Sequence, residues 1–194
     1  MQNAESILVA YYYFDFKDIL KRDLCGLLSS LIFQLCEHSD RCWDILSQLH
    51  IACDRGLEQP NEIELTQCLQ NILEHLGQEV PVYIIVDALD ECPHDTGMPS
   101  PREMVLEFLE NLVGSKRPNL YICLTSRPEQ DIQAILNPLI SDSRRISLHE
   151  EGGQREDILN YVRHFVHNDR IMRRWRAEDK ELVIDALSER ADGM

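Results

Sequence analysis

The stretch that decides the fold reads Val82-Tyr83-Ile84-Ile85-Val86-Asp87-Ala88-Leu89-Asp90-Glu91. Its first five residues are apolar on both alternating faces, which is typical of a strand in a parallel sheet that helices cover on both sides. Three carboxylates follow, those of Asp87, Asp90 and Glu91. Because an unpaired ionised group is costly to bury, these side chains need water, an ion-pair partner or a metal. The stretch therefore predicts a central parallel strand with acidic groups at its carboxyl end.

A second polar segment follows the apolar run Leu120-Tyr121-Ile122-Cys123-Leu124, which predicts another strand. This segment reads Thr125-Ser126-Arg127-Pro128-Glu129. Because the carboxyl ends of parallel strands line one crevice, we expect it to lie beside the acidic residues that follow Val86. The sequence therefore predicts that carboxylates and a guanidinium group meet at one rim of the sheet.

The residue types at this rim suit phosphate chemistry with magnesium. Asp87 is placed to hold Mg²⁺ directly or through water, since magnesium prefers oxygen ligands and keeps several waters. Glu91 could polarise a water for attack on a γ-phosphate. Arg127 could contact the terminal phosphate, with Thr125 or Ser126 orienting the water.

A simpler interpretation is open for both segments. Acidic side chains are mostly solvated, so Asp87, Asp90 and Glu91 could do no more than begin an exposed loop. Arg127 could pair with Glu129 or with an acid of the preceding loop, and the intervening proline could simply start a helix.

Strands and helices alternate on both sides of these segments. Short apolar runs predict strands, and apolar positions at steps of three and four predict helices. The expected strands cover residues 7–14, 82–86, 120–124 and 145–148, and the expected helices cover 24–35, 40–52, 61–76, 100–114 and 129–136. Asn61 with Glu64, and Ser100 with Glu103, have the spacing of capping boxes.

The pattern changes at Gly152-Gly153, after which only helices are expected, over residues 158–166 and 177–191. Repeated strand–helix units imply an α/β fold with a parallel sheet between two helix layers. We therefore expect a three-layer parallel-sheet core over residues 1–150 and the start of a helical subdomain over residues 151–194. In the first strand, buried packing of Tyr11-Tyr12-Tyr13 is favoured over base stacking.

Composition argues against several classes of partner. The formal net charge is −15, whereas nucleic acid or an anionic membrane surface is bound by clustered Lys and Arg. The basic run Arg173-Arg174-Trp175-Arg176 is interpreted as a solvated linker or as the partner of intramolecular acids. The seven cysteines form no C-x-x-C pair, and no apolar run approaches the length of a membrane span. We expect no nucleic-acid or membrane partner, reduced thiols and a cytoplasmic location.

The two polar segments in tandem resemble a known family. A strand ending in Asp87-Ala88-Leu89-Asp90-Glu91, followed by a strand ending in Thr125-Ser126-Arg127-Pro128-Glu129, resembles the Walker B and sensor 1 elements of NACHT domains. These domains belong to the STAND class of P-loop NTPases. The resemblance is closest to the nephrocystin-like N-terminal NACHT regions of fungal NLR-type proteins, and segments 10–15 and 190–194 share it.

The resemblance implies a role for each matching residue. Asp87 would be the aspartate that holds Mg²⁺, and Asp90 and Glu91 would be the acidic pair that activates water. Arg127 would be the sensor 1 arginine. Thr125 and Ser126, which precede it, would contact the nucleotide. Members of the family are ATP- or GTP-binding signalling switches that couple the nucleotide state to self-association. The cofactors implied for the complete domain are therefore Mg²⁺ and ATP or GTP, and the implied partners are the nucleotide and further copies of the domain.

The phosphate-binding loop of that family does not occur in this sequence. Such a loop needs G-x-x-x-x-G-K-[ST], in which backbone N–H groups cradle phosphate and the lysine reaches its oxygens. The chain has eight glycines, and none is followed by lysine. We therefore expect a fragment of a P-loop NTPase core that lacks its first strand and loop, and that binds ATP weakly or not at all.

Two alternatives stay open. The chain could be a non-catalytic scaffold or interaction module that kept the fold and lost nucleotide chemistry. It could also be a standalone metal-dependent hydrolase that uses Asp87, Asp90 and Glu91, although the sequence lacks the second set of ligands that such sites use. The sequence leaves open whether the chain is itself an enzyme.

Overall fold

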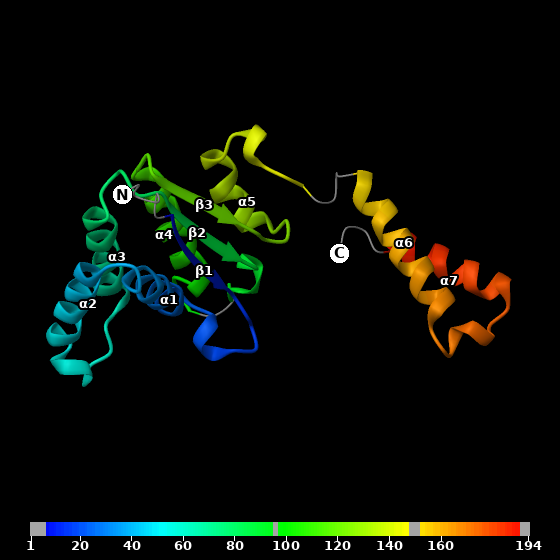
Figure 1. The fold of residues 1–194 in the computed structure, drawn as a ribbon, viewed down its shortest axis with the longest axis horizontal. Coiled ribbons are helices and arrows are strands. Elements are labelled where there is room, and N and C mark those ends of the chain that lie inside the picture. The colour runs from blue at the N-terminus through cyan, green and yellow to red at the C-terminus, as the bar shows by residue number, and fades with distance from the viewer. Residues whose placement is uncertain (1–6, 95–96, 148–151, 191–194) are drawn as a thin grey trace, which may run out of the picture. The chain divides into compact units, whose positions relative to one another are not determined.

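A three-stranded parallel sheet forms the centre of the fold in this computed structural model, which describes residues 7–94, 97–147 and 152–190. The strands are β1 (Leu8–Tyr13), β2 (Val82–Asp87) and β3 (Leu120–Leu124), in the order β1-β2-β3 (Figure 1). The strands expected at residues 7–14, 82–86 and 120–124 are therefore confirmed. The strand that carries the acidic residues is central among them, as the sequence predicts.

Helices lie between and after these strands at the expected positions. They are α1 (Leu24–Cys36), α2 (Asp40–Ala52), α3 (Glu62–His75), α4 (Pro101–Gly114) and α5 (Gln130–Leu136). Both capping boxes are present, Asn61 with Glu64 at the start of α3 and Ser100 with Glu103 at the start of α4. Two short 3-10 turns, η1 (Ile19–Lys21) and η3 (Leu89–Glu91), lie after β1 and β2 and shape the loops near the carboxyl ends of the strands.

One face of the sheet is covered and holds the core. The parallel register places every second residue of each strand on this face, from Leu8, Val82 and Leu120 at one end to Tyr12, Val86 and Leu124 at the other. α1 packs against β1, α4 packs against α1, and α5 packs against α4, which makes one helix layer. The apolar stripe of α1 is almost completely buried, at Leu27, Leu28, Leu31, Ile32 and Leu35.

The opposite face of the sheet is exposed among the described residues, which corrects the prediction of helices on both faces. Six apolar residues there are 37–58% exposed: Val9, Tyr11, Tyr13, Tyr83, Ile85 and Tyr121. Because successive side chains of a strand point to opposite faces, a single helix layer buries only alternate residues. The prediction that Tyr11 and Tyr13 are buried is therefore wrong, whereas Tyr12 is 6% exposed.

The outer edge of β1 is occupied by a side chain. The Tyr11 N–H donates to Gln34 Oε1 at 3.0 Å, and Gln34 Nε2 donates to the Tyr11 C=O at 2.7 Å. The amide of Gln34 thus makes the pair of bonds that an adjacent strand would make at this position. The outer edge of β3 has no strand partner among the residues that the structure describes.

The strand predicted at residues 145–148 is wrong where the structure describes it. Asp142–Arg144 form a 3-10 turn, and residues 145–147 belong to no strand, while Leu148 lies outside the described residues. A strand needs a partner for its backbone groups, and the described segment is paired with none of the three strands. Its apolar residue Ile146 is 78% exposed, so burial does not hold the segment in place either.

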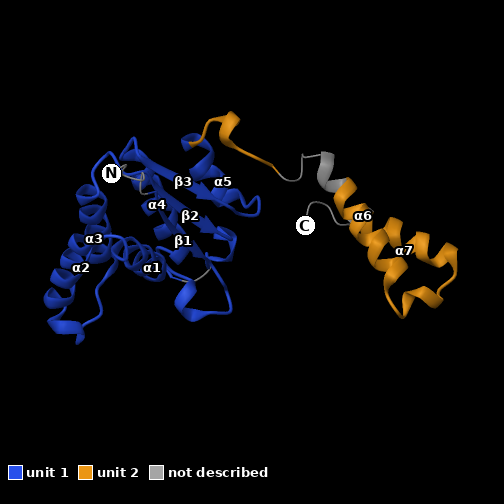
Figure 2. Cartoon of the chain, in the orientation of Figure 1, with its two compact units in different colours: residues 1–139 blue, residues 140–194 orange. Residues whose placement is uncertain are grey.

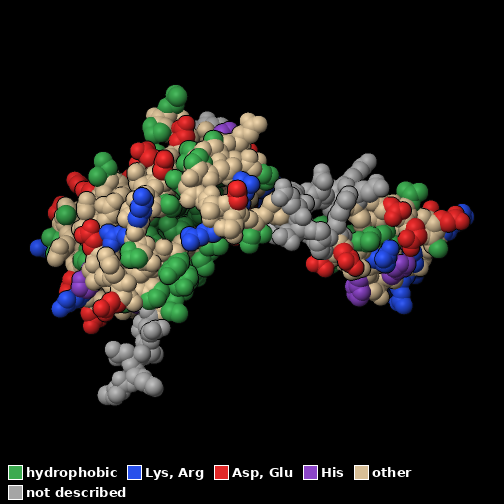
Figure 3. Space-filling view, turned by 90° about the horizontal axis from the view of Figure 1, so that it is seen from above, with side chains coloured by type: hydrophobic (Ala, Val, Ile, Leu, Met, Phe, Trp, Pro, Cys, Tyr) green, Lys and Arg blue, Asp and Glu red, His purple; other side chains and the backbone are tan. Residues whose placement is uncertain are grey.

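The chain divides into two compact units, residues 1–139 and residues 140–194 (Figure 2). The second unit holds α6 (Gly152–Asn168) and α7 (Ala177–Arg190), which pack against each other and match the helices expected after Gly152-Gly153. Hydrophobic side chains reach the surface in both units (Figure 3). None of the helices in the described ranges has both the length and the apolar character needed to cross a membrane.

Candidate functional site

The ends of β2 and β3 are joined by hydrogen bonds that follow from their register. The parallel pairing brings Asp87 and Thr125 next to each other at the carboxyl ends of the two strands. Thr125 Oγ1 donates to the carboxylate of Asp87 and accepts from the Ala88 N–H at 3.0 Å. The Leu89 N–H then donates to the Thr125 C=O, also at 3.0 Å. The first carboxylate of the expected site therefore lies against a hydroxyl of the second polar segment.

The chain turns sharply directly after Asp87. Ala88 has φ 54° and ψ 46°, a left-handed conformation that residues with a Cβ adopt only rarely. This turn leads from β2 into η3, where Leu89 is buried and Asp90 and Glu91 are partly exposed. Backbone strain of this kind persists only where surrounding contacts hold it, and it is enriched at functional sites.

Asp90 is bound to the second polar segment. Its Oδ1 accepts from the Arg127 N–H at 3.0 Å, and its Oδ2 lies 3.4 Å from Arg127 Nε. The Asp90 side chain is only 12% exposed, whereas that of Arg127 is 77% exposed. Asp90 therefore fixes the position of Arg127, and the outer N–H groups of the guanidinium remain accessible to an anion.

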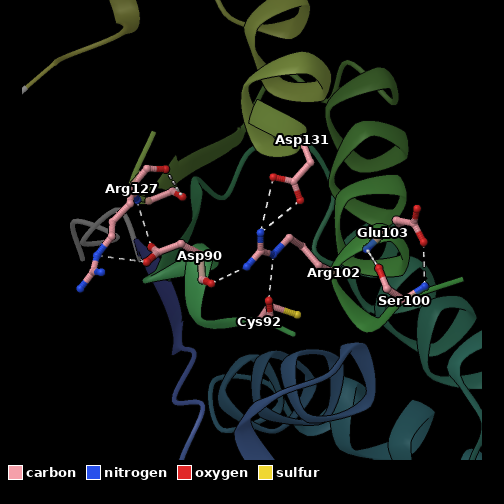
Figure 4. Close-up of polar contacts among 8 residues, drawn as sticks. Asp90, Cys92, Ser100, Arg102, Glu103, Arg127 and Asp131 are labelled. Carbon is pink, nitrogen blue, oxygen red and sulfur yellow. Dashed lines mark hydrogen bonds and ion pairs between the residues drawn. The ribbon is translucent and has the colours of Figure 1, made fainter. Parts of the chain in front are cut away.

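A buried arginine lies beneath this turn. Arg102, in the first turn of α4, is 6% exposed. Its Nε donates to the Cys92 C=O at 2.8 Å, and its Nη2 donates to the Asp90 C=O at 2.6 Å. Its Nη1 pairs with the carboxylate of Asp131 in α5 at 3.1 Å. Figure 4 shows this guanidinium between the acidic turn and α5, so Arg102 ties residues 90–92 to the helix layer.

The contact with Arg102 changes the pKa of the Asp131 carboxyl group. Burial alone would raise the pKa of the carboxyl group, but hydrogen bonds from Arg102 and from the backbone, together with the charge of Arg102, outweigh burial. The pKa of Asp131 is therefore lowered below its usual value. The ionised pair stabilises the fold at neutral pH, and this stabilisation is lost in acid as the carboxylate is protonated.

A comparison of the wild type with Asp131→Asn across pH tests this coupling. At pH 7 the variant should be less stable, because it lacks the charge that pairs with Arg102. The difference should shrink as the pH falls below about 4, the ordinary range for a carboxyl group, and vanish below the lowered pKa of the folded state. Urea unfolding of both proteins at each pH measures this difference in the free energy of unfolding. A difference that stays constant into acid would show that the charge of Asp131 contributes nothing.

A pocket of about 750 Å³ lies beside Asp90, Glu91 and Arg127. Its other walls come from the loop after β1, from residues 92–94, and from the start of α4. Glu91 joins two of these walls, because its carboxylate accepts from the Phe16 N–H at 3.3 Å. The volume lies within the range of about 300–1,000 Å³ that is usual for small-molecule sites.

One thiol lies in the wall of this pocket, that of Cys92. Burial raises the pKa of Cys92 to about 12, and its Sγ donates to the Arg22 C=O at 3.3 Å. A thiol that keeps its proton is a poor nucleophile. Among the residues that the structure describes, no three His, Cys, Asp or Glu side chains are grouped in a way that could hold a metal.

A family model described as nephrocystin 3, N-terminal, matches residues 1–127. The chain belongs to this family. The match covers all three strands and both polar segments as far as Arg127. No curated protein and no solved structure matches the chain.

Within this member of the nephrocystin 3 N-terminal family, the expected site residues fall into two groups. Asp87 and Thr125 lie together at the strand ends, and Asp90, Glu91 and Arg127 line the pocket. Ser126 joins neither group by a side-chain contact among the described residues, since its hydroxyl donates to the C=O of the next residue at 2.7 Å. The simpler expectation that Arg127 pairs with an acid of the preceding loop is met by Asp90.

These residues fit Mg²⁺ and a phosphate in part. The Asp87 carboxylate and the Thr125 hydroxyl are oxygen donors, and magnesium needs only one or two carboxylates when waters and phosphate complete its shell. The exposed guanidinium of Arg127 suits a phosphate oxygen. The cradle of backbone N–H groups that binds a triphosphate tightly requires a glycine-rich loop with lysine, which the sequence does not contain.

Sequence reasoning missed Arg102, although a signal for it existed. The apolar stripe of α4 runs through Val105, Leu106, Leu109 and Leu112, at steps of three and four residues. Arg102 falls on the same stripe, three residues before Val105. An arginine on the buried side of a helix requires acceptors in the core, so its position alone marks it as a structural anchor.

Proposed function

We propose that this chain is the part of a NACHT-type nucleotide-binding module that carries the magnesium-binding carboxylate and the phosphate-contacting arginine. The observation that supports the proposal is the junction of β2 and β3, where Asp87 meets Thr125 and Asp90 meets Arg127. A carboxylate beside a hydroxyl, with an exposed guanidinium at the same rim, suits Mg²⁺ and a terminal phosphate. The module would be a P-loop NTPase core of a STAND-type signalling switch that acts in the cytoplasm.

The contacts refine the role of each residue under this proposal. Asp87 holds the metal, and the Thr125 hydroxyl fixes the orientation of its carboxylate. Asp90 positions Arg127, because both of its oxygens are engaged by that residue. Glu91 lines the pocket and is, of the three acidic residues that follow Val86, the one left to accept a proton from water. Bound Mg²⁺ would neutralise charge on the phosphate oxygens.

Tight nucleotide binding is not expected of this chain. Without the phosphate cradle, the rim offers one exposed guanidinium and a carboxylate to the ligand. The outer edge of β3 has no partner among the described strands. A strand that carries the phosphate-binding loop would pair with this edge. We therefore expect a dissociation constant for Mg·ATP in the millimolar range and no sustained hydrolysis.

Nuclear magnetic resonance tests the proposal, because it detects weak binding residue by residue. Titration of Mg·ATP to millimolar concentration should shift the backbone amides of residues 88–91 and 125–127. Arg127→Ala should abolish these shifts, since it removes the phosphate contact. Arg117→Ala serves as the matched control, because Arg117 pairs with Glu74 at 3.4 Å and lies outside the residues that line the pocket.

The outcome separates the nucleotide module from the alternative of a scaffold. Absence of shifts at the rim with millimolar Mg·ATP or Mg·GTP favours a module that kept the fold and lost nucleotide chemistry. Micromolar binding by calorimetry would contradict the expectation of weak affinity. Shifts that persist in Arg127→Ala would place the ligand elsewhere on the chain.

A further inference from the structure

The turn between α6 and α7 in the second unit carries concentrated positive charge (Figure 1). It comprises residues 170–176 and is called the basic turn below. Four arginines lie there with no acid among them: Arg170, Arg173, Arg174 and Arg176. All four are exposed. A chain whose net charge is −15 therefore presents a short, strongly basic segment to solvent.

The backbone of the basic turn is fixed by hydrogen bonds. Asp169 Oδ1 accepts from the N–H groups of Ile171 at 2.8 Å and of Met172 at 3.0 Å. The Asp169 C=O accepts from the Arg173 N–H at 2.9 Å. The segment is thus an ordered turn with a 3-10 helix at its centre, rather than the free linker that the sequence allowed. A turn that is already ordered loses little entropy when a partner binds.

The charges of the basic turn are not neutralised by acids of the described residues. None of the ion pairs within the described ranges includes one of the four arginines. The nearby carboxylate of Asp169 accepts from the backbone, and that of Glu181 lies 4.0 Å from His167. The alternative that intramolecular acids pair with this run is therefore not met there. The guanidinium groups keep their N–H donors for an external anion, and a guanidinium binds a carboxylate through two parallel hydrogen bonds.

Two apolar side chains accompany these cations. Ile171 is 73% exposed and Trp175 is 41% exposed. Arginine and tryptophan are enriched among the residues that contribute most to protein–protein binding. An acidic protein segment with apolar residues between its carboxylates matches the charge and the apolar surface of the basic turn.

The charge of the neighbouring residues favours a short acidic segment over a larger polyanion. The Debye length at physiological salt is about 8 Å, so a peptide that lies on the turn interacts mainly with the arginines. A nucleic acid or an anionic membrane extends further. It would also meet acidic side chains such as Glu178 and Asp179, which are exposed in the first turn of α7 directly after the basic turn.

We propose that the basic turn binds a short acidic segment of a partner protein. The carboxylates of that segment lie on the arginines, and an apolar side chain between them contacts Trp175. None of the residues that line the pocket at Arg127 takes part. The inference therefore goes beyond the nucleotide function and does not depend on it.

Fluorescence anisotropy of a labelled peptide, made of six glutamates and two leucines, tests the binding to the full chain. At low salt we expect a dissociation constant of about 10–100 µM, and binding should weaken as salt is raised. The same peptide with glutamine in place of glutamate should not bind. Absence of binding up to about 1 mM acidic peptide, or equal binding of the glutamine peptide, overturns the proposal.

A double variant, Arg173→Gln with Arg174→Gln, tests whether the basic turn is the site. It removes two of the four charges and should weaken binding by at least about tenfold. Arg144→Gln with Arg145→Gln is the matched control, because these arginines are also adjacent and exposed, and they also belong to the second unit. The control should bind almost as the wild type does. Equal losses in the two variants would mean that the peptide responds only to overall charge, which contradicts the proposal.

Trp175 provides a second measurement, on a chain that keeps all its arginines. The chain has two tryptophans, so Trp43→Phe leaves Trp175 as the source of tryptophan emission. The acidic peptide should change this emission over the same concentration range as the anisotropy. Emission that stays constant at saturation would place the peptide elsewhere and overturn the proposal.

Two further probes distinguish the acidic segment from the larger polyanions. Single-stranded DNA of about 20 nucleotides, and vesicles with about 30% phosphatidylserine, should bind the chain more weakly than the peptide does at physiological salt. Tighter binding of either probe, lost in the Arg173→Gln, Arg174→Gln variant, would make the turn a nucleic-acid or membrane site and overturn the proposal.

Discussion

Replacing Arg102 with methionine should lower the free energy of unfolding by about 3 kcal/mol, because the substitution breaks a buried ion pair. Methionine preserves much of the apolar stem but removes the donors to the carbonyl groups of Asp90 and Cys92. Buried acceptors that lose their partners cost about 1–3 kcal/mol each. Asp131 also loses its cation, although 40% of its side chain is exposed and water can solvate part of the charge.

Arg117→Met is the matched control for this prediction. Arg117 also pairs with a carboxylate at 3.4 Å, but its partner Glu74 is 67% exposed. Exposed pairs of this kind contribute about 0.2–1 kcal/mol, so urea unfolding should show a much smaller loss. Equal losses in the two variants would mean that Arg102 does not anchor the acidic turn. The Arg102 variant should also broaden the amide resonance of Arg127, because the turn that holds Asp90 is released.

Gly26→Ala should destabilise the chain by about 2 kcal/mol, although alanine normally favours a helix over glycine. A Cβ at this position in the first turn of α1 would collide with the backbone oxygen of Leu20 and lie 2.7 Å from the Tyr12 hydroxyl. Neither neighbour can easily move. Tyr12 is 6% exposed in the core, and its hydroxyl donates to that same Leu20 oxygen at 3.5 Å.

Gly114→Ala, at the end of α4, provides the comparison. A Cβ there meets no atom within 4 Å, so the substitution should stabilise the chain by about 0.5 kcal/mol through the entropy of the unfolded state. Thermal unfolding of the two variants should therefore shift in opposite directions. If both midpoints of thermal unfolding shifted in the same direction, the backbone of η1 would be able to move away from Gly26, which contradicts the prediction.

The elements that sequence reasoning placed correctly depend on neighbours a few residues away. The capping boxes at Asn61 and Ser100 need only a residue three positions on, and the strands need only a short apolar run. The meeting of the two polar segments was also predictable, since adjacent parallel strands end at the same edge. These features could be inferred because local chemistry and a general rule of topology specify them.

The features that were predicted wrongly depend on contacts distant in sequence. Nothing local distinguishes the buried Tyr12 from the exposed Tyr11 and Tyr13, because the location of the helix layer decides which face is covered. The segment around Ile146 has the composition of a strand but no described strand beside it. For Asp90 the sequence left two roles open, activation of water and pairing with Arg127, and the geometry shows the contact with Arg127.

The amide of Gln34 makes the two edges of the sheet unequal as sites for an added strand. By occupying both backbone groups of Tyr11, it blocks strand addition at the middle of the β1 edge, which works against edge-to-edge polymerisation there. The other margin, along β3, has no such guard among the described residues. A peptide that added in parallel along β3 would end next to Arg127, so the margin without a guard is also the one that leads to the exposed guanidinium.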